Sequence, residues 1–416
     1  MSIGLLRRNR NYRLLLTATG ISTLGDGVSA LAFPWLATLL TRDPLLIAAL
    51  SVAGQLPLFL FALPAGVMID RADRQRIMVR ADLFRMALTF GIVGLILTLP
   101  SLPPPGGALP VIAALAMLSF LLGSAGVLRE NAAQTALPAV VARADLEAAN
   151  GQLWSVEQVM RAFAGPPLAG VLIGVSVALP FGLDAVSFAL AAALVAALVL
   201  APRELMAPAR RFRTELAEGL TWLTSQPFLL RLGLMLGGLN ALSSAALTML
   251  VLYSREVLHL DAAGYGLLMA AGAAGGVLGG LTGPALTRAL GATRSLHLAL
   301  FACVAGYALL AFGQSAALAA AALFIDAFAG IAWNIVTVSY RQRVIPDAMM
   351  GRVNGVYRFL GLGPMPLGAL AGGLAVSMTA PWLGRTLALH MPYVLATAGS
   401  LLLLLYGMAR LRVPEG

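Results

Sequence analysis

The chain has 416 residues, of which 59% are hydrophobic and 11% are charged. Soluble domains are about 45–50% apolar and about 25% charged, so this composition excludes a water-soluble globule. All 28 basic residues are arginines, and without lysine the chain cannot build a Walker A phosphate-binding loop. A single cysteine, Cys303, excludes an internal disulfide, and the three histidines lack metal-ligand spacing. We therefore expect no cofactor, no metal, no nucleic-acid partner and no ATP-driven transport by this chain alone.

Apolar runs of about 20 residues recur along the chain, each long enough for an α-helix to cross a hydrocarbon core of about 30 Å. Backbone amides in lipid must be paired within a helix or a closed barrel, and ten-residue alternating strands are not seen in the sequence. We predict an all-α integral membrane protein. Its twelve transmembrane helices are predicted at residues 14–40, 44–69, 81–99, 109–128, 150–175, 179–201, 228–253, 263–286, 295–312, 315–340, 353–378 and 386–408.

The arginines predict the orientation of these spans. An even number of spans places both termini on one side, and the loops and termini of that side carry 21 arginines. The opposite side has only Arg42, Arg255 and Arg385. The positive-inside rule therefore predicts that both termini are cytoplasmic. The first apolar run is too long for a cleavable signal peptide, so we expect it to be a true span.

Three repeats predict two halves. They pair Gly66-x-x-x-Asp70-Arg71 with Gly283-x-x-x-Thr287-Arg288, Gln134-x-x-x-Pro138 with Gln342-x-x-x-Pro346, and Gly165-Pro166-x-x-x-Gly170 with Gly363-Pro364-x-x-x-Gly368. We expect six-helix bundles at residues 1–201 and 228–416, in pseudo-symmetric relation, and a cytoplasmic linker at 202–227. Helical spacing of Phe212, Leu216, Leu220 and Leu223 predicts an amphipathic helix on the membrane surface, with a solvated linker helix as the alternative.

The stretch from Gly66 through Asp70 and Arg71 to Arg76 resembles the signature of the major facilitator superfamily between its second and third helices. It departs from that signature at Asp73, where glycine is usual, and at Gln75, where a basic residue is usual. Other motifs resemble the branch that holds bacterial macrolide-efflux-like and enterobactin-exporter-like proteins. These are Asn11-Tyr12-Arg13, Leu24-Gly25-Asp26, Asp184-Ala-x-Ser187-Phe188, Glu218-Gly219-Leu220 and Gly351-Arg352-Val353.

The resemblance implies an alternating-access carrier in the bacterial cytoplasmic membrane, with spans 1, 4, 7 and 10 lining a central cavity. It also implies export, usually by proton antiport. In the family, the acid at Asp70 and the arginines after it bridge the halves when the cytoplasmic side is closed. We therefore expect a cytoplasmic gate formed by Gly66, Asp70, Arg71, Arg74, Arg76 and Glu130. Plain topological placement of the arginines is the alternative.

Two acids lie near the middle of predicted spans, Asp26 in the first and Asp326 in the tenth. A charge at the bilayer centre costs at least about 2.5–3.5 kcal/mol, so such residues face a wet cavity, a partner or hold a proton. A carboxyl group kept from water can carry a proton and release it when its surroundings change. We expect Asp26 and Asp326 to couple transport to protons. The alternative for Asp26 is a structural role beside Gly25 and Gly27.

Polar stripes on the first, seventh and tenth spans predict a substrate cavity lined by Ser22, Ser29, Asn240, Ser244, Trp333, Asn334 and Thr337. Close helix packing is expected at Gly165, Pro166, Gly170, Gly363, Pro364 and Gly368. Glu157 and Arg161, four residues apart, are expected to pair on one helix face. Asp184 is expected to order the outer end of its helix.

The sequence thus predicts a secondary transporter that exports a moderately hydrophobic small molecule, a drug-like compound or a siderophore, by proton antiport. We expect a monomer whose partners are its substrate, protons and membrane lipids. A facilitator, an importer and a lipid flippase on the same fold are the alternatives. An enzyme is not expected, because paired acidic motifs, a Ser-Lys dyad and a zinc site are missing from the sequence.

Overall fold

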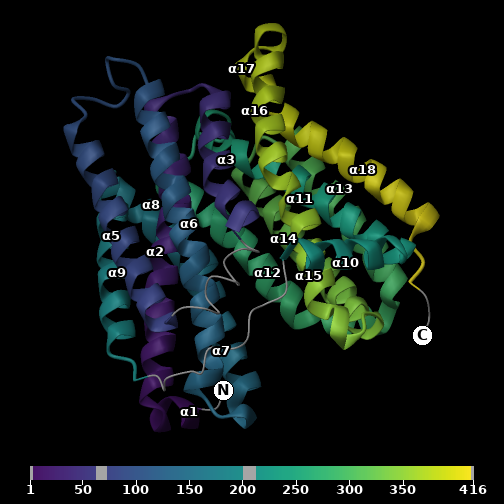
Figure 1. The fold of residues 1–416 in the computed structure, drawn as a ribbon. Coiled ribbons are helices and arrows are strands. Elements are labelled where there is room, and N and C mark those ends of the chain that lie inside the picture. The colour runs from purple at the N-terminus through teal and green to yellow at the C-terminus, as the bar shows by residue number, and fades with distance from the viewer. Residues whose placement is uncertain (1–2, 62–72, 200–211, 414–416) are drawn as a thin grey trace. The chain divides into compact units, whose positions relative to one another are not determined.

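The structure of the protein is a computed structural model that describes residues 3–61, 73–199 and 212–413. Within those ranges all regular structure is helical (Figure 1). Twelve helical stretches there are long and apolar enough to cross a bilayer, which confirms the predicted all-α fold. Large apolar side chains are exposed on them, among them Leu97, Phe312 and Trp382. Such a surface suits lipid and would promote aggregation in water.

The first half of the chain contains α1 (Ile3–Arg8), α2 (Arg10–Leu40), α3 (Pro44–Phe61), α5 (Arg74–Thr98), α6 (Leu109–Val140), α7 (Leu146–Gln158), α8 (Gly165–Val175) and α9 (Leu179–Ala196). A 3₁₀ turn, η1 (Arg143–Asp145), precedes α7, and a π-helical segment, η2 (Val159–Ala164), follows it. Because η2 joins α7 to α8 without a break, Arg143–Val175 forms the fifth span.

The second half contains α10 (Phe212–Thr224), α11 (Pro227–Glu256), α12 (Ala262–Leu290), α13 (Ala292–Phe312), α14 (Ala316–Val344), α15 (Asp347–Leu362), α16 (Pro364–Leu383), α17 (Arg385–Ala388) and α18 (Met391–Arg410). Gly363 ends α15 and begins α16, and the two helices make one span, Met349–Leu383.

The helices pack into two compact units. The N-terminal unit is built from the described parts of Met1–Thr41, Ala53–Ala209 and Ala262–Gly266. The C-terminal unit is built from the described parts of Arg42–Val52, Arg210–Asp261 and Leu267–Gly416. In the N-terminal unit α9 packs against both α2 and α5 (Figure 1). The domain boundaries predicted at 1–201, 202–227 and 228–416 stay a prediction.

Two helices are longer than their apolar runs. α5 begins at Arg74 rather than at residue 81, because the Asp73 side chain accepts a hydrogen bond from the Arg76 amide at 3.2 Å and caps the helix. α6 continues to Val140 rather than ending at residue 128. Arg129 therefore lies inside α6, not in the loop after it. Apolar runs indicate only the part of a helix that lies in lipid. They do not predict polar turns that extend the helix beyond the membrane.

The linker helix α10 packs on α15 within the C-terminal unit. Glu218 forms an ion pair with Arg352 at 2.8 Å. A Cβ atom on Gly219 would lie 2.7 Å from the Arg352 carbonyl oxygen, so only glycine allows this approach. Leu223 is buried and Leu220 is exposed. The amphipathic helix expected from the sequence thus has a protein partner for part of its apolar face.

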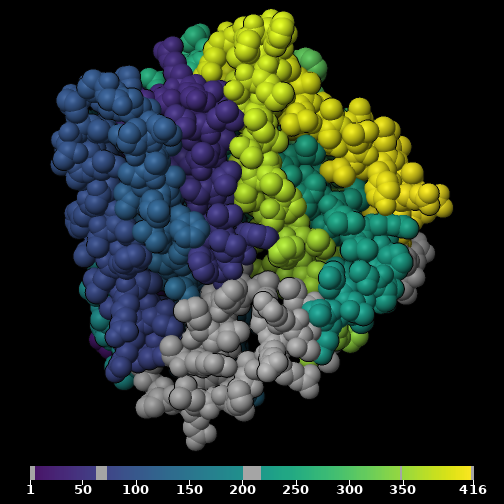
Figure 2. All heavy atoms as spheres, turned by 45° about the horizontal axis from the view of Figure 1, so that its top comes forward, coloured from purple at the N-terminus to yellow at the C-terminus, as the bar shows by residue number. Residues whose placement is uncertain are grey.

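Small residues bring helices into backbone contact at repeated positions. A Cβ atom on Gly165 of α8 would lie 2.6 Å from the Gly27 backbone of α2, and one on Gly368 of α16 would collide with the Ala241 carbonyl of α11. Gly170 meets Ala262 in the same way. In the C-terminal unit the first turns of α3 lie against Gly373 of α16, and the purple and yellow-green atoms of these segments adjoin in Figure 2. These contacts hold the helices that carry the polar groups at fixed separations.

Candidate functional site

Asp26 lies near the middle of α2, where two flanking glycines bring other helices close. A Cβ atom on Gly25 would collide with the Asp184 side chain of α9. A Cβ atom on Gly27 would lie 2.5 Å from the Arg161 carbonyl oxygen of η2. Only glycine permits these approaches, so α9 and η2 pack directly beside the Asp26 carboxylate.

Arg85 of α5 is the principal partner of Asp26. Its Nη2 donates a hydrogen bond to Asp26 Oδ1 within an ion pair, and its Nη1 donates to the Ser22 hydroxyl at 3.3 Å. The guanidinium also lies over the Phe188 ring, 3.9 Å from its centroid. Arg85 is 5% exposed. Because an unpaired buried charge costs several kcal/mol, Asp26 and Arg85 each depend on the other.

A second ion pair lies deeper in the same unit. Asp82 is fully buried, and its Oδ2 lies 3.5 Å from Arg129 Nε while its Oδ1 lies 3.7 Å from Arg85 Nη1. Arg129 Nη1 donates to the Thr19 hydroxyl at 3.5 Å. Among the described residues neither Asp82 oxygen has a hydrogen-bond donor at closer range. At these separations the groups attract one another electrostatically without close hydrogen bonds.

Arg161 approaches Asp26 from the other side. Its Nη2 lies 3.7 Å from Asp26 Oδ2 and 4.0 Å from Glu130 Oε1. The expected partner Glu157 interacts electrostatically with Arg161 but is not in ion-pair range: within the described chain the ion pairs of Arg161 are with Asp26 and Glu130. The reason is that the helix becomes π-helical at Val159, between the two residues, so the α-helical spacing that would align them is lost.

These contacts form one series of alternating charges within the N-terminal unit. In order, its members are Arg129, Asp82, Arg85, Asp26, Arg161 and Glu130. Both ends of the series lie on α6, and its formal charges sum to zero. Exposure rises along it: the Arg85 and Asp82 side chains are buried, Asp26 is 24% exposed, and Arg161 is 45% exposed. Asp26 therefore joins a buried arginine to a hydrated one.

Asp184 lies beside this series without an arginine in ion-pair range among the described residues. Ser29 of α2 donates a hydrogen bond to Asp184 Oδ2, and the Ser187 hydroxyl lies 3.4 Å from Oδ1. Asp184 is 2% exposed. The expectation that it orders a helix end is incomplete, because its carboxylate links α9 to α2. The sequence did not predict that Asp82, Arg85 and Asp184 lie together. The spacing of Asp82 and Arg85 on one face of a predicted span could have indicated that both belong to a charged cluster.

The C-terminal unit contains a separate cavity of about 90 Å³ around Asp326. Helices α11, α13 and α14 line it. Its polar side chains come from Asn240, Ser243, Tyr307, Asp326, Trp333 and Asn334, together with Cys303. The Tyr307 hydroxyl donates a hydrogen bond to Asp326 and accepts one from Ser243. Three of the predicted cavity residues, Asn240, Trp333 and Asn334, thus meet the predicted coupling acid in one place.

The other predicted cavity residues have different surroundings. Ser22 and Ser29 are buried and hydrogen-bonded to Arg85 and Asp184 in the N-terminal unit. Ser244 is buried in α11, and the Thr337 hydroxyl donates to the Trp333 carbonyl of its own helix at 2.9 Å. Their role in substrate binding stays a prediction.

The predicted cytoplasmic gate is described only in part. Gly66, Asp70 and Arg71 lie outside the described residues. Arg74 begins α5, and Arg76 forms an ion pair with Asp73 at 3.2 Å. Glu130 is an end of the charge series. The gate itself stays a prediction.

The two departures from the superfamily signature have structural roles. Asp73 caps α5, as described above. The Gln75 amide nitrogen donates to the carbonyl oxygens of Val195, Ala196 and Leu198 at 3.0, 3.1 and 2.9 Å. These carbonyls belong to the last turn of α9 and the residues after it. Gln75 therefore donates to carbonyl groups at the end of α9 that lack partners within the helix. A neutral amide does this without adding a charge.

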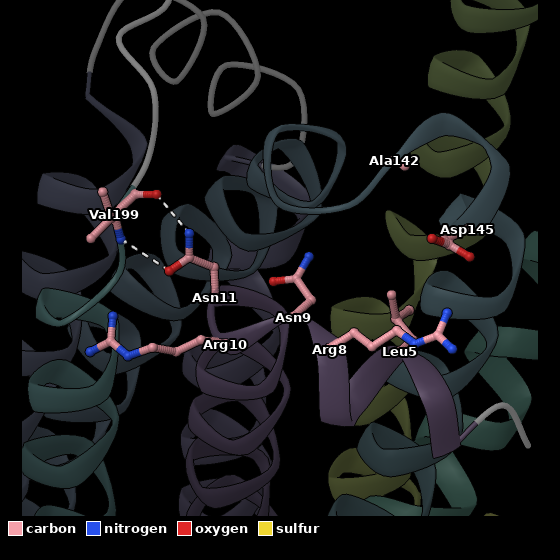
Figure 3. Close-up of a pocket in the computed structure, with 8 residues that line it drawn as sticks. All are labelled: Leu5, Arg8, Asn9, Arg10, Asn11, Ala142, Asp145 and Val199. Atoms are coloured by element: carbon pink, nitrogen blue, oxygen red, sulfur yellow. Dashed lines mark hydrogen bonds between the residues drawn. The ribbon is translucent and has the colours of Figure 1, made fainter.

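The Asn-Tyr-Arg motif at the start of α2 also has a structural role. Asn11 donates to the Val199 carbonyl at 2.7 Å and accepts from the Val199 amide at 3.2 Å (Figure 3). The Tyr12 hydroxyl donates to Gln152 at 2.8 Å. An open pocket of about 690 Å³ lies here, lined by Leu5, Arg8, Asn9, Arg10, Asn11, Ala142, Asp145 and Val199. Figure 3 shows Arg8 and Arg10 pointing to opposite sides of it.

The fold of this chain is similar to that of known membrane proteins. By fold it resembles solved membrane transporters, each less than 25% identical. A bacterial homologue of the iron transporter ferroportin in the inward-facing state gives a TM-score of 0.74 at 19% identity, covering 96% of this chain and 98% of that one. The nucleoside transporter NupG gives 0.75 at 15% identity, covering 97% and 100%. The twelve candidate spans therefore adopt the fold of these membrane proteins.

The chain belongs to the transmembrane secretion effector family, whose sequence profile matches residues 6–415. The enterobactin exporter EntS of Citrobacter koseri is 28% identical over 425 residues, covering 100% of this chain and 96% of that protein. The multidrug efflux pump Tap of Mycobacterium tuberculosis is 30% identical over 171 residues, covering 38% of this chain and 37% of the pump. The resemblance to the efflux branch of the superfamily is thereby confirmed.

Proposed function

We propose that this protein exports a moderately hydrophobic small molecule, a drug-like compound or a siderophore, in exchange for protons. The observation that carries the proposal is the position of Asp26 between a buried arginine, Arg85, and a half-exposed one, Arg161. An acid that is neutralised by arginines in one state and opened to water in another can take up and release a proton. Asp326 is proposed as a second coupling acid.

Export is supported by the names of the relatives, an exporter and an efflux pump. A proton moving down 100 mV supplies about 2.3 kcal/mol, and a tenfold substrate gradient needs about 1.4 kcal/mol. One proton per substrate therefore sustains a concentration ratio above ten. A moderately apolar ligand fits spans that carry few fixed charges outside the series described above.

The proposal includes a monomer in the bacterial cytoplasmic membrane with both termini in the cytoplasm. Its support is the distribution of arginines. The three that lie on the predicted outer side gather in the C-terminal unit. Arg385 pairs with Glu256 at 2.8 and 3.0 Å and donates to the Arg42 carbonyl at 2.6 Å. Arg42 and Arg255 line a cavity of about 310 Å³ with Glu256. The gate residues Asp70, Arg71, Arg74 and Arg76 are proposed to act at the inner side.

Flux into proteoliposomes tests the proposal. Purified protein is reconstituted with an acidic lumen, and the uptake of a macrolide, ethidium and a catecholate siderophore is measured with and without the pH gradient. We expect uptake of at least one compound that depends on the gradient. Uptake that is equal with and without it would identify a facilitator, and uptake driven by an alkaline lumen would identify a symporter.

A further inference from the structure

The cavity around Asp326 is too small for the proposed substrate. Pockets for drug-sized molecules have volumes of about 300–1,000 Å³, whereas this one measures about 90 Å³. A space of this size accommodates a few water molecules or one small ion with part of its hydration shell. Its occupant is therefore a small, hydrated species.

Charge balance selects a cation of single charge. Asp326 is the acid of the cavity, and within the described residues no arginine or histidine lies in ion-pair range of it. A carboxylate at the depth of the membrane needs a positive charge close by. One monovalent cation neutralises one carboxylate, whereas a divalent cation would leave a net positive charge buried. Clusters of three or more His, Cys, Asp or Glu, which would favour a divalent metal, do not occur among the described residues.

The lining supplies oxygen ligands that are held in place. The Asn240 amide nitrogen donates to the Gly361 carbonyl at 2.9 Å, which leaves the Asn240 oxygen as the free end of the side chain. The Tyr307 hydroxyl is fixed between Ser243 and Asp326. Asn334 adds a further amide oxygen to the lining. Carboxylate, amide and hydroxyl oxygens are ligands for hard cations.

Trp333 adds a donor to the same wall. Its side chain is 2% exposed, and its indole N–H has no acceptor within the part of the chain that the structure describes. An indole N–H cannot bind a cation, but it can donate to a water molecule that completes the hydration shell of one. A buried donor without a partner is costly, so a bound water beside it is expected.

We propose that this cavity is a sodium site, at which Na⁺ competes with the proton for Asp326. The proposal deepens the function proposed above and rests on it only in naming Asp326 as a coupling acid. Sodium binding at this site would give the transporter a second ion that biases the C-terminal unit, separate from the charge series that contains Asp26.

Radioactive sodium binding to the detergent-purified full chain tests the proposal. ²²Na⁺ binding is measured at pH 8 and at pH 6 by scintillation proximity, with displacement by NaCl and with choline chloride to hold ionic strength. We expect saturable binding that is displaced by NaCl and weaker at pH 6. Asp326→Asn should abolish it, and Asn240→Leu should weaken it by about tenfold, the loss expected for one ligand to a charged group.

Thr397→Val is the matched control, because the Thr397 hydroxyl donates to the Tyr393 carbonyl of its own helix at 2.7 Å and does not line the cavity. It should bind sodium as the wild type does. If Asp326→Asn does not fold, Asn240→Leu decides. Absence of saturable binding to the folded wild type, or wild-type affinity in Asn240→Leu, would overturn the proposal. Proton-coupled flux in sodium-free choline buffer reports on the proposed function alone, so the two can fail independently.

Discussion

The guanidinium of Arg85 on α5 and the carboxylate of Asp26 on α2 form an ion pair in the interior of the N-terminal unit. Their pairing joins two helices that are far apart in the sequence, and it places the acid between buried and hydrated arginines. Asp26 also pairs with Arg161, at 3.7 Å. The two arginines differ in exposure, 6% and 45% for their side chains, so a change in hydration would affect them unequally.

Replacing Arg85 should strongly destabilise the protein. Arg85→Met leaves the carboxylates of Asp26 and Asp82 without their shared partner, and breaking a buried ion pair costs about 3–5 kcal/mol. Thermal unfolding in detergent measures the effect. Adding Asp26→Asn to Arg85→Met should recover part of the loss, because it removes one of the two carboxylate charges that lose Arg85.

Arg76→Ala is the surface control for this prediction. Its ion pair with Asp73 is exposed, and exposed pairs contribute about 0.2–1 kcal/mol. A melting temperature as low in Arg76→Ala as in Arg85→Met would show that burial does not govern the cost of losing these pairs.

Two glycines of α8 should respond in opposite ways to alanine. Gly165→Ala places a methyl group 2.6 Å from the Gly27 backbone, and overpacking of this kind costs about 1–3 kcal/mol. Gly174 has open space around its Cβ position, so Gly174→Ala should be neutral or stabilise the helix by up to about 1 kcal/mol. Melting temperatures of the two variants provide the comparison, and equal losses would contradict the described packing of α8 on α2.

Gln75→Met should lower stability by about 1–3 kcal/mol, because it leaves carbonyl groups at the end of α9 without their donor. Gln134, which is exposed on α6, provides a matched Gln134→Met control with an expected change within about 0.5 kcal/mol. Hydrogen exchange of the last turn of α9 should rise in the first variant only. Unchanged exchange in Gln75→Met would mean that this amide does not hold the helix end.

Accessibility of single cysteines tests the proposed orientation. The native cysteine is first removed by Cys303→Ala. Single cysteines are then introduced by Pro105→Cys, in the exposed loop between α5 and α6, and by Ala144→Cys, in the exposed turn after α6. A membrane-impermeant maleimide added to whole cells should label the first and not the second. The reverse pattern would place the termini outside.

Hydrophobic length was sufficient to predict the spans, because lipid imposes that pattern on each helix separately. Asp26 and Asp326 could be singled out for the same reason, since a charge in an apolar run is conspicuous. Their partners could not. The Asp26 contacts with Arg85 and Arg161 cross between helices, and no periodicity within one helix encodes them. Glu157 interacts with Arg161 at longer range than an ion pair, because a π-helical segment begins between them and changes the register.

Proton movement driven by substrate tests whether Asp26 couples transport to protons. Proteoliposomes that contain a pH-sensitive dye, start with equal pH on both sides and lack sodium are given an inward gradient of ethidium, or of whichever panel compound gives the largest flux. If Asp26 carries the exchanged proton, the lumen of wild-type and Glu147→Gln liposomes becomes alkaline as the compound enters, whereas Asp26→Asn moves the compound without a pH change. Glu147 is an exposed acid outside the charge series. Alkalinisation by folded Asp26→Asn at the wild-type rate would show that Asp26 does not carry the exchanged proton.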